Sequence, residues 1–267
     1  MIRIQSRKNE YIKELSGLVR SSEKRHAQGL FVVEGARLCR DAARSGLKLE
    51  AVLATPQAAE KYSAYVGEIA AKAKESIEIA DSIAPLLSDT RSPQGVFCVV
   101  HLPSLEERGI DRLPGVGRYL AVENMQDPAN LGAVCRTAEA LGISGVILLG
   151  TCCDFYGPKA LRAGMGAAFR LPVYMASSFQ QAVPVFRDKQ MRTFAAVPDE
   201  NAVPVTQCVF TDRCVMLVGN EGNGLLPETI EMCDQTVTIP MLGRAESLNA
   251  AASASILMWE MMRGKEG

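Results

Sequence analysis

Apolar residues recur along the chain in two alternating patterns, one with the spacing of a helix and one of short runs typical of strands. Residues 3–27 place apolar side chains at roughly helical spacing, with Lys and Arg between them, which predicts a helix there. Short apolar runs predict strands at residues 31–33, 49–54, 77–80 and 95–101. Further helices are expected over residues 36–45, 57–74 and 82–88. The N-terminal part of the chain is therefore expected to form one small α/β unit.

This alternation breaks at residues 105–118. The stretch is rich in charge, Pro and Gly and lacks apolar periodicity, which is typical of a linker. We therefore expect one domain at residues 1–105, a linker at 106–117 and a second domain at 118–267.

The second domain alternates strands and helices again. Strands are expected at residues 119–122, 145–149, 172–175, 193–197, 215–218 and 236–239. Helices are expected at residues 131–140, 159–168, 179–187, 227–232 and 247–263. Such alternation predicts a mostly parallel sheet covered on both faces. Because ligands of these sheets bind beyond the carboxyl ends of the strands, the turns after Val122, Val218 and Ile239 are the places to search for chemistry.

The first of these turns spans residues 124–138 and runs from a strand into a helix. Asn130 is expected to cap that helix, after an Asp127–Pro128 turn. Arg136 lies off the apolar stripe of the helix, so its guanidinium is free to face solvent or a cleft. Considered alone, it is more typical of a solvated helix arginine than of a catalytic group.

A second turn, residues 218–225, spaces its glycines as G-x-x-G-x-G. This is neither the G-x-G-x-x-G dinucleotide fingerprint nor a P-loop. Glycines after a strand allow a ligand to approach the backbone closely, although a tight loop explains them equally well.

The third turn spans residues 239–249 and leads into a helix rich in Ala and Ser. Ser247 is expected to cap that helix. Small residues there permit close packing of backbone against backbone or against a ligand. Trp259 and its methionine neighbours are more typical of a core or a subunit interface than of a cofactor site.

Composition narrows the class of protein. Hydrophobic residues make up 48% of the 267 and charged residues 22%, which excludes a mainly disordered, collagen-like or coiled-coil chain. No apolar run approaches the roughly 18 residues of a membrane span, and the basic N-terminus lacks the apolar core of a secretory signal. Residues 1–50 hold 11 Lys/Arg and 6 Asp/Glu, a net of +5, whereas residues 106–267 hold 14 and 18, a net of −4. A basic end on a mildly acidic body favours an anionic partner for that end, although a solvated helix face explains the charges about as well.

Cysteine and histidine usage excludes other chemistries. The eight Cys include no Cys-x-x-Cys and there are only two His, so neither a zinc site nor a disulfide framework is expected. Reduced thiols in the cytoplasm are the simple interpretation. His26 and His101 lie outside the three turns, so no Ser–His–Asp set forms, and Asp-rich metal clusters are absent. Group transfer from an electrophilic cofactor fits the remaining chemistry.

Together the three turns resemble the SpoU (TrmH) family of RNA 2′-O-ribose methyltransferases, part of the SPOUT superfamily. The matching segments are residues 130–138, residues 218–224, and Ile239-Pro-Met followed by Ser247-Leu-Asn249. Their order and separations match as well, over residues 118–263. More loosely, Phe31-Val-Val-Glu-Gly35 and Pro93-Gln-Gly-Val96 resemble the N-terminal substrate-binding domain of that family, and the basic charge agrees with RNA binding.

The resemblance implies an α/β fold with two domains. The C-terminal SPOUT domain would have a parallel sheet and a deep trefoil knot, and the smaller N-terminal α/β domain would be ribosomal-protein-like and bind RNA. S-adenosylmethionine would bind in the knot, lined by Gly219, Ile239 and Leu248. The family works as a homodimer with its active site near the subunit interface, and neither a metal nor a membrane is implied.

The resemblance also implies the catalytic residues. Arg136 aligns with the arginine proposed to activate the 2′-hydroxyl. Because an arginine is a poor base, we expect it to hold a phosphate and stabilise the developing alkoxide. The other matching polar positions are expected to orient Arg136, the interface or the substrate and cofactor pocket; they are Asn130, Glu221, Ser247 and Asn249.

The leading interpretation is an enzyme that methylates a ribose 2′-oxygen of structured RNA. Ribosomal RNA is favoured, with tRNA as the second candidate. A catalytically inactive RNA-binding member is a different class, disfavoured by the five intact polar positions. Base methylation and a nucleotide-dependent oxidoreductase are also disfavoured, the latter by the missing fingerprint. The sequence does not identify the target nucleotide, and it assigns no role to Arg244 or to the pair Cys152 and Cys153.

Overall fold

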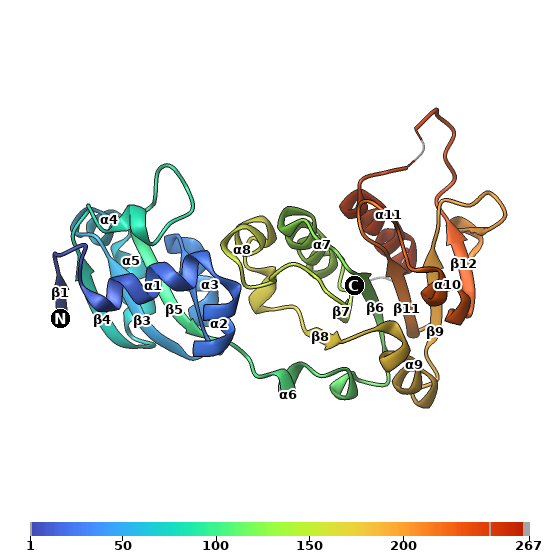
Figure 1. Cartoon of the computed structure of the whole chain (residues 1–267), viewed down its shortest axis with the longest axis horizontal. Helices are drawn as coiled ribbons and strands as arrows, with labels where there is room; N and C mark the ends of the chain where they lie inside the picture. The colour runs from blue at the N-terminus through green and yellow to red at the C-terminus, as the bar shows by residue number, and fades with distance from the viewer. Residues whose placement is uncertain (1, 246, 264–267) are drawn as a thin grey trace. The chain divides into compact units, whose positions relative to one another are not determined.

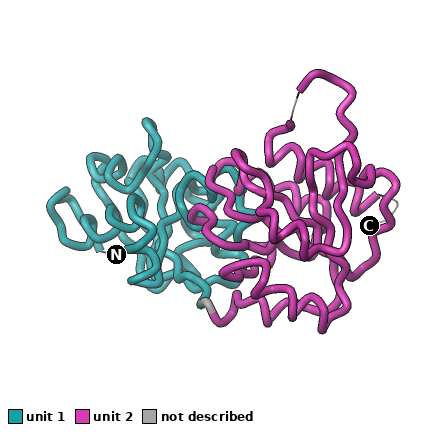
Figure 2. Tube along the Cα trace, turned by 45° about the vertical axis from the view of Figure 1, so that its right-hand side comes forward, with its two compact units in different colours: residues 1–104, 156–169 teal, residues 105–155, 170–267 magenta. Residues whose placement is uncertain are grey.

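The computed structural model describes residues 2–245 and 247–263. The chain divides into two compact units, residues 1–104 with 156–169, and residues 105–155 with 170–267 (Figure 1, Figure 2). Residues 156–169 lie within the sequence range expected for the second domain, yet they belong to the first unit.

The first unit is built on a five-stranded mixed sheet. Its strand order is β1-β4-β3-β5-β2. Strands β1, β4 and β3 pair in parallel, and β5 pairs antiparallel with both of its neighbours, β3 and β2. The strands are β1 (Ile2–Ile4), β2 (Leu30–Glu34), β3 (Leu49–Ala54), β4 (Ala73–Ile79) and β5 (Val96–His101). Mixed pairing makes this sheet distinct from the all-parallel sheet of the second unit.

Helices cover this sheet. They are α1 (Glu10–Arg20), α2 (Ser22–Gln28), α3 (Ala36–Arg44), α4 (Pro56–Lys61), α5 (Ser63–Ala70), the 3-10 turn η1 (Ala84–Leu86), α8 (Pro158–Gly164) and η3 (Ala167–Phe169). The amphipathic α1 lies across one face of the sheet, where it buries Ile12, Leu15 and Leu18 against strand residues such as Leu53 and Phe97 (Figure 1). Helices α3 and α5 contact each other, and both contact the sheet.

The expected helix over residues 3–27 is wrong in its boundaries. The first residues form β1, which pairs with β4, and α1 begins only after Asn9, whose side chain accepts from the backbone N–H of Ile12 at 3.4 Å. A second break falls at Ser21, which caps α2 by accepting from Lys24 N at 3.2 Å. Both breaks occur at residues that compete for backbone hydrogen bonds, and helical periodicity alone did not weigh them.

The second unit has seven parallel strands, which confirms the expected parallel α/β fold. Their order is β10-β12-β9-β11-β6-β7-β8. The strands are β6 (Gly117–Glu123), β7 (Gly145–Leu149), β8 (Val173–Ala176), β9 (Arg192–Ala196), β10 (Val203–Pro204), β11 (Arg213–Val218) and β12 (Gln235–Thr238). The helices are α6 (Leu105–Arg108), α7 (Pro128–Ala140), α9 (Phe179–Asp188), α10 (Pro227–Met232) and α11 (Ala250–Met262), with 3-10 turns η2 (Ile110–Arg112) and η4 (Val205–Gln207).

Part of the stretch expected to be a linker is packed into the second unit. It contains α6 and η2, and Ile110 and Leu113 are 5% and 1% exposed within the core cluster of that unit. Ile110 and Leu113 were the sequence evidence that this stretch is packed, but the charged residues and glycines around them break any apolar periodicity. The stretch is therefore part of the fold of the second unit.

A buried arginine fixes the end of α11. Arg118, on β6, donates through Nη1 to the carbonyl of Met261 and through Nη2 to the carbonyl of Phe210 at 2.8 Å. Met261 is in the last turn of α11, whose carbonyls lack intrahelical donors. The single guanidinium thus ties α11 to β6 and to the segment that precedes β11.

Replacing Arg118 by Met should therefore destabilise the second unit by about 2–3 kcal/mol, because two carbonyl groups lose their donor in a buried place. Urea unfolding, followed by the fluorescence of Trp259, measures this loss of stability. Trp259 is the only tryptophan and lies in α11. Arg187→Met, at an exposed arginine of α9, is the control and should change stability by less than about 0.5 kcal/mol. Equal unfolding midpoints for the two variants would show that the Arg118 contacts do not hold α11.

Candidate functional site

A cavity of about 630 Å³ opens at the carboxyl ends of β12, β9 and β11. These strands are neighbours in the sheet, so their ends form one edge, where ligands of parallel α/β sheets bind. The cavity is lined by the segment after β9, the glycine loop after β11, the segment after β12 and the start of α11. Among the residues singled out in the sequence, its lining includes Gly219, Glu221, Ile239, Ser247 and Leu248.

The glycine loop after β11 turns back on itself. Asn220 and Gly224 exchange backbone hydrogen bonds of 3.1 and 3.2 Å, and the Asn220 side-chain oxygen accepts from the backbone of Gly222 and Asn223. A Cβ on Gly219 would lie 1.9 Å from the carbonyl carbon of Gly224. Only glycine fits at position 219, because the clash would be with backbone and could not be relieved by a side-chain rotation.

Glu221 lies in this loop, and its side chain binds the turn that leads into α7. Its carboxylate accepts from Asn130 Nδ2 at 2.9 Å and from the backbone N–H groups of Gln126 and Asp127 at 3.2 and 3.1 Å. Asn130 Oδ1 in turn accepts from Asn249 Nδ2 at 3.1 Å. The three side chains form a chain of hydrogen bonds that joins all three sequence motifs.

Asn249 completes the chain by capping α11. Its Oδ1 accepts from the backbone N–H groups of Ala251 and Ala252 at 2.9 and 3.2 Å. The capping role expected of Ser247 is therefore wrong, because α11 begins at Ala250 and Ser247 lies too early in the chain. Ser247 is exposed and lines the cavity instead.

Likewise, Asn130 is not the cap of α7. The helix begins at Pro128, and the side chain of Asp127 accepts from Ala129 N at 2.8 Å. Proline is favoured at the first helical position because its fixed φ suits the helix and its missing N–H would have no partner there. The earlier start leaves the Asn130 side chain free to bridge Glu221 and Asn249.

The pKa of Glu221 reflects this environment. Burial raises the pKa of its carboxyl group, but the hydrogen bonds from Asn130 and from backbone N–H groups stabilise the charged form and lower the pKa below its ordinary value overall. Glu221 is therefore ionised at neutral pH, as an acceptor of three hydrogen bonds requires.

Arg136 does not join this network. It lies on α7 about 9 Å along the helix axis from Asn130 and roughly 120° around it. It is exposed and makes no hydrogen bond or ion pair with any residue in the described ranges. All its donors are therefore available to a ligand.

Sequence reasoning missed a buried carboxylate beside the site. Glu123, at the end of β6, is 3% exposed and accepts from Leu226 N at 2.9 Å and from Thr229 Oγ1 at 2.6 Å. It thereby fixes the start of α10, directly after the glycine loop. The signal was a single acidic residue at the end of an otherwise apolar strand.

Cys152 and Cys153 help to shape the first turn. The Cys152 thiol donates to the Leu149 carbonyl at 3.4 Å, and the backbone N–H of Cys153 donates to Met125 O at 2.7 Å. Burial, with smaller effects of neighbouring groups such as Glu221, raises the pKa of the Cys153 thiol to about 12. Burial also raises the pKa of the Cys152 thiol, so neither thiol is activated as a thiolate at neutral pH. Arg244 is exposed.

Comparison with known proteins gives two family matches. Residues 117–259 match the SpoU rRNA Methylase family, and residues 9–98 match the MRM3-like substrate binding domain. The first match alone covers more than half of the chain.

Relatives that match along nearly the whole chain include two 23S rRNA methyltransferases. The 23S rRNA (uridine(2479)-2′-O)-methyltransferase of Streptomyces viridochromogenes is 32% identical over 98% of this chain and 92% of its own length. The 23S rRNA (guanosine(2553)-2′-O)-methyltransferase RlmP of Bacillus subtilis is 26% identical over 98% of this chain and 99% of its own length.

Solved structures agree with these matches. An AdoMet-bound rRNA methyltransferase from Sinorhizobium meliloti has a TM-score of 0.85 at 26% identity, covering 99% of this chain and 98% of its own. The SpoU methyltransferase AviRb from Streptomyces viridochromogenes, in complex with AdoMet, has a TM-score of 0.85 at 27% identity, covering 96% and 98%.

The hydrogen bonds of Glu221 generate a pH-dependent prediction. Since folding lowers its pKa, the stabilisation linked to its charge is complete above the ordinary value of 4.5 and is lost as the pH falls through the lower folded value. Glu221→Gln should cost about 1 kcal/mol at pH 7, and the difference from the wild type should shrink below pH 4.5.

Urea unfolding at a series of pH values measures this difference. Glu231→Gln is the control, because Glu231 is an exposed carboxylate of α10 with no hydrogen bond among the residues described. A Glu221→Gln effect that stays constant from pH 7 to pH 3.5 would contradict the assigned contacts.

Proposed function

This chain belongs to the SpoU rRNA methylase family, and we propose that it transfers a methyl group from S-adenosylmethionine to a ribose 2′-oxygen of structured RNA. Ribosomal RNA is the favoured substrate, because the characterised relatives are named for 23S rRNA positions, and tRNA is the second candidate. The observation that carries the proposal is the cavity at the strand ends, which lies beside the three joined motifs.

The residues at this cavity fit S-adenosylmethionine. The volume suits a ligand of that size, and Gly219 permits the tight backbone turn of the loop that lines the cavity. We propose that Gly219, Ile239 and Leu248 hold the cofactor. When bound, the sulfonium supplies an electrophilic methyl group, so the protein's own task is to position and activate the hydroxyl that receives it.

We propose that Arg136 is the catalytic residue that activates this hydroxyl. A guanidinium stays protonated, so it does not act as the base. Its rigid fork of donors instead suits an RNA phosphate and the negative charge that develops on the 2′-oxygen. The exposure of Arg136, and its lack of any partner among the described residues, support this role.

The network of Asn130, Glu221 and Asn249 acts as a positioning device in this proposal. It joins α7, which carries Arg136, to the glycine loop and to the start of α11. Holding reacting groups in line supplies up to roughly 7–11 kcal/mol of a barrier, so the relative placement of these elements matters. Ser247, on the cavity wall, would contact the substrate or the cofactor.

Three further features belong to this proposal. We infer that the chain forms a homodimer, because α11 exposes Trp259 (57%) and Ile256 (38%) on one face that a second copy would cover. We infer a trefoil knot in the second domain, in keeping with the family resemblance. We place the protein in the cytoplasm, where its eight free cysteines would stay reduced. No helix among the described residues is long and apolar enough to cross a membrane.

We also propose a division of labour in which residues 1–105 bind RNA and residues 118–267 carry the methyl transfer. Residues 106–117 join the two, although part of this stretch packs into the second unit. The match to the MRM3-like substrate binding domain and the net charge of +5 over residues 1–50 support the RNA-binding part.

Replacing Arg136 by Ala should reduce methyl transfer to rRNA by at least 100-fold while leaving S-adenosylmethionine affinity within a few-fold, because the residue meets the RNA and not the cofactor. Incorporation of labelled methyl groups and calorimetric titration measure the two effects. Arg187→Ala, at an exposed arginine of the same unit that has no partner among the residues described, should behave as the wild type. Near-normal turnover by Arg136→Ala would remove it from the mechanism.

The glycine loop offers a matched pair of variants for the cofactor site. Gly219→Ala should abolish detectable S-adenosylmethionine binding, because its Cβ meets backbone at 1.9 Å, whereas Gly222→Ala should bind within about twofold of the wild type, because its Cβ has no neighbour closer than 3.9 Å. Calorimetric titration distinguishes them. Equal affinities for both variants would place the cofactor elsewhere.

A further inference from the structure

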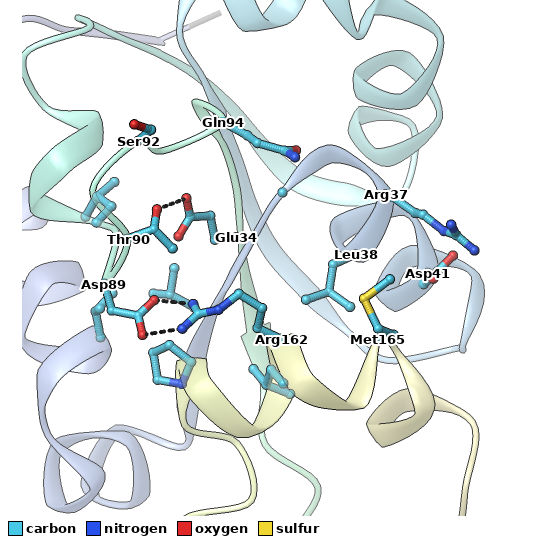
Figure 3. A pocket seen from close by; sticks show the side chains of 16 residues that line it. Glu34, Arg37, Leu38, Asp41, Asp89, Thr90, Ser92, Gln94, Arg162 and Met165 are labelled. Atoms are coloured by element: carbon cyan, nitrogen blue, oxygen red, sulfur yellow. Dashed lines mark hydrogen bonds and ion pairs between the residues drawn. The ribbon is translucent and has the colours of Figure 1, made fainter. Parts of the chain in front are cut away.

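The first unit contains its own cavity of about 360 Å³, apart from the strand-end cavity of the second unit (Figure 3). It lies among α3, the segment before β5 and α8, and all its lining residues belong to the first unit. Its volume falls in the range of roughly 300–1,000 Å³ that is typical of small-ligand pockets. The methyl transfer proposed above uses none of its residues.

Apolar side chains from five segments of the first unit form part of its wall. They are Val19, Val32, Leu38, Leu87 and Leu161. An apolar wall of this kind suits a flat ring, which loses contact with water on both faces when it enters. The occupant is therefore expected to be largely planar.

The cavity also contains a carboxylate held in a fixed position. Glu34, at the end of β2, accepts from Ser88 Oγ at 2.7 Å. It also accepts from Thr90 Oγ1 at 3.4 Å (Figure 3). It has no ion pair with any residue in the described part of the chain. A carboxylate has about four acceptor sites, so two hydroxyl donors leave Glu34 able to accept further hydrogen bonds.

Gln94 places an amide donor in the same cavity. Its Oε1 accepts from Ala36 N at 3.2 Å, at the start of α3, which leaves the two Nε2 hydrogens without a partner in the described ranges. Gly35 makes this arrangement possible, because its φ is +102° and a Cβ there would lie 3.3 Å from that oxygen. The amide is therefore oriented by the fold.

Two other acidic residues, Asp41 and Asp89, also line the cavity. Asp89 forms a two-point ion pair with Arg162 of α8, with Nη2 and Oδ2 3.0 Å apart (Figure 3). Asp89 is thus neutralised, whereas Glu34 keeps spare acceptor capacity, and Glu34 and Gln94 line the same cavity. A ligand with two adjacent N–H donors and one neighbouring acceptor would satisfy both.

We propose that this cavity receives one unstacked guanine base of the RNA substrate, an inference that rests on the proposed function. The Watson–Crick edge of guanine carries the N1–H and N2–H donors beside the O6 acceptor, which match the Glu34 carboxylate and the Gln94 amide. Sequence-specific RNA recognition reads single-stranded bases in this way, by burying the ring and bonding its edge.

Basic residues near the cavity favour RNA over a free small molecule as its ligand. Val19 and Leu87 line the cavity, and their sequence neighbours Arg20 and Leu86 line a second hollow. The other charged residues of that hollow are all cations: Arg7, Lys13 and Lys24. The phosphates that flank an inserted guanine would contact the cations of this second hollow.

The test uses the full chain and three probes. Fluorescence anisotropy measures the binding of labelled single-stranded RNAs A4GA4, A4IA4 and A4AA4, where I is inosine, which lacks the 2-amino group of guanine. We expect the guanine probe to bind about tenfold more tightly than the other two. Labelled methyl transfer to an unmodified 23S rRNA transcript gives the second readout, KM and kcat.

Leu38→Trp, which fills the cavity, should remove the preference for guanine and raise KM for rRNA about tenfold with kcat unchanged. Glu34→Gln, which keeps the shape but loses an acceptor, should abolish the discrimination against inosine. Ala64→Trp, at an exposed position of α5 outside the cavity, is the matched control and should change neither readout.

The outcomes separate the two proposals. A wild-type protein that methylates rRNA but shows no guanine preference, or whose KM is unaffected by both cavity variants, overturns the guanine site and leaves the proposed function standing. A guanine preference that both variants abolish, in a protein that methylates no RNA, supports the site and overturns the proposed function.

Discussion

The carboxylate of Glu221 is the contact on which the arrangement of the second unit's site depends. It is one charged group that accepts from a side chain of α7 and from two backbone N–H groups of the preceding turn. Asn130 passes the connection on to Asn249, whose other end starts α11. Segments nearly 120 residues apart in sequence are thus fixed by three short polar side chains. A charged acceptor with several donors makes stronger hydrogen bonds than a neutral one, which suits a site that must stay open on one side.

Other residues hold in place the elements that make this contact. Gly219 allows the loop that presents Glu221 to close on itself, and Glu123 fixes the start of α10 where the loop ends. Arg118 fixes the opposite end of α11, the helix that Asn249 begins. The glycine loop and α11 are therefore each held by polar contacts at both ends. Arg136 stands apart from all of these contacts, in keeping with the substrate-binding role proposed for it.

Sequence predicted the repeating parts of this fold well and the local breaks poorly. Six of the seven parallel strands of the second unit were predicted from apolar runs, because a strand buried on both faces needs them, whereas the two-residue β10 was missed. The helix over residues 3–27 was not divided, since Asn9 and Ser21 act through single side-chain hydrogen bonds that leave the apolar spacing intact. For the site, the motifs identified the polar residues, but not their partners. Asn130 and Ser247 were both expected to cap helices, because the start of a helix is decided by Pro128 in one case and by Asn249 in the other. Glu123 was missed because one acidic residue after an apolar run has no periodic signal.

The path of the chain between the two units has a consequence for how this protein can be divided. The backbone passes from one unit to the other three times, after residues 104, 155 and 169. A single cut near residue 105 would leave α8 on the C-terminal fragment, separated from β2, against which it packs. Limited proteolysis there would yield two pieces that stay associated through that helix. Recombination of genes at that point would likewise give a hybrid only if both parents carried compatible versions of residues 156–169. The two units are thus inherited as a pair, although each has its own sheet and its own core.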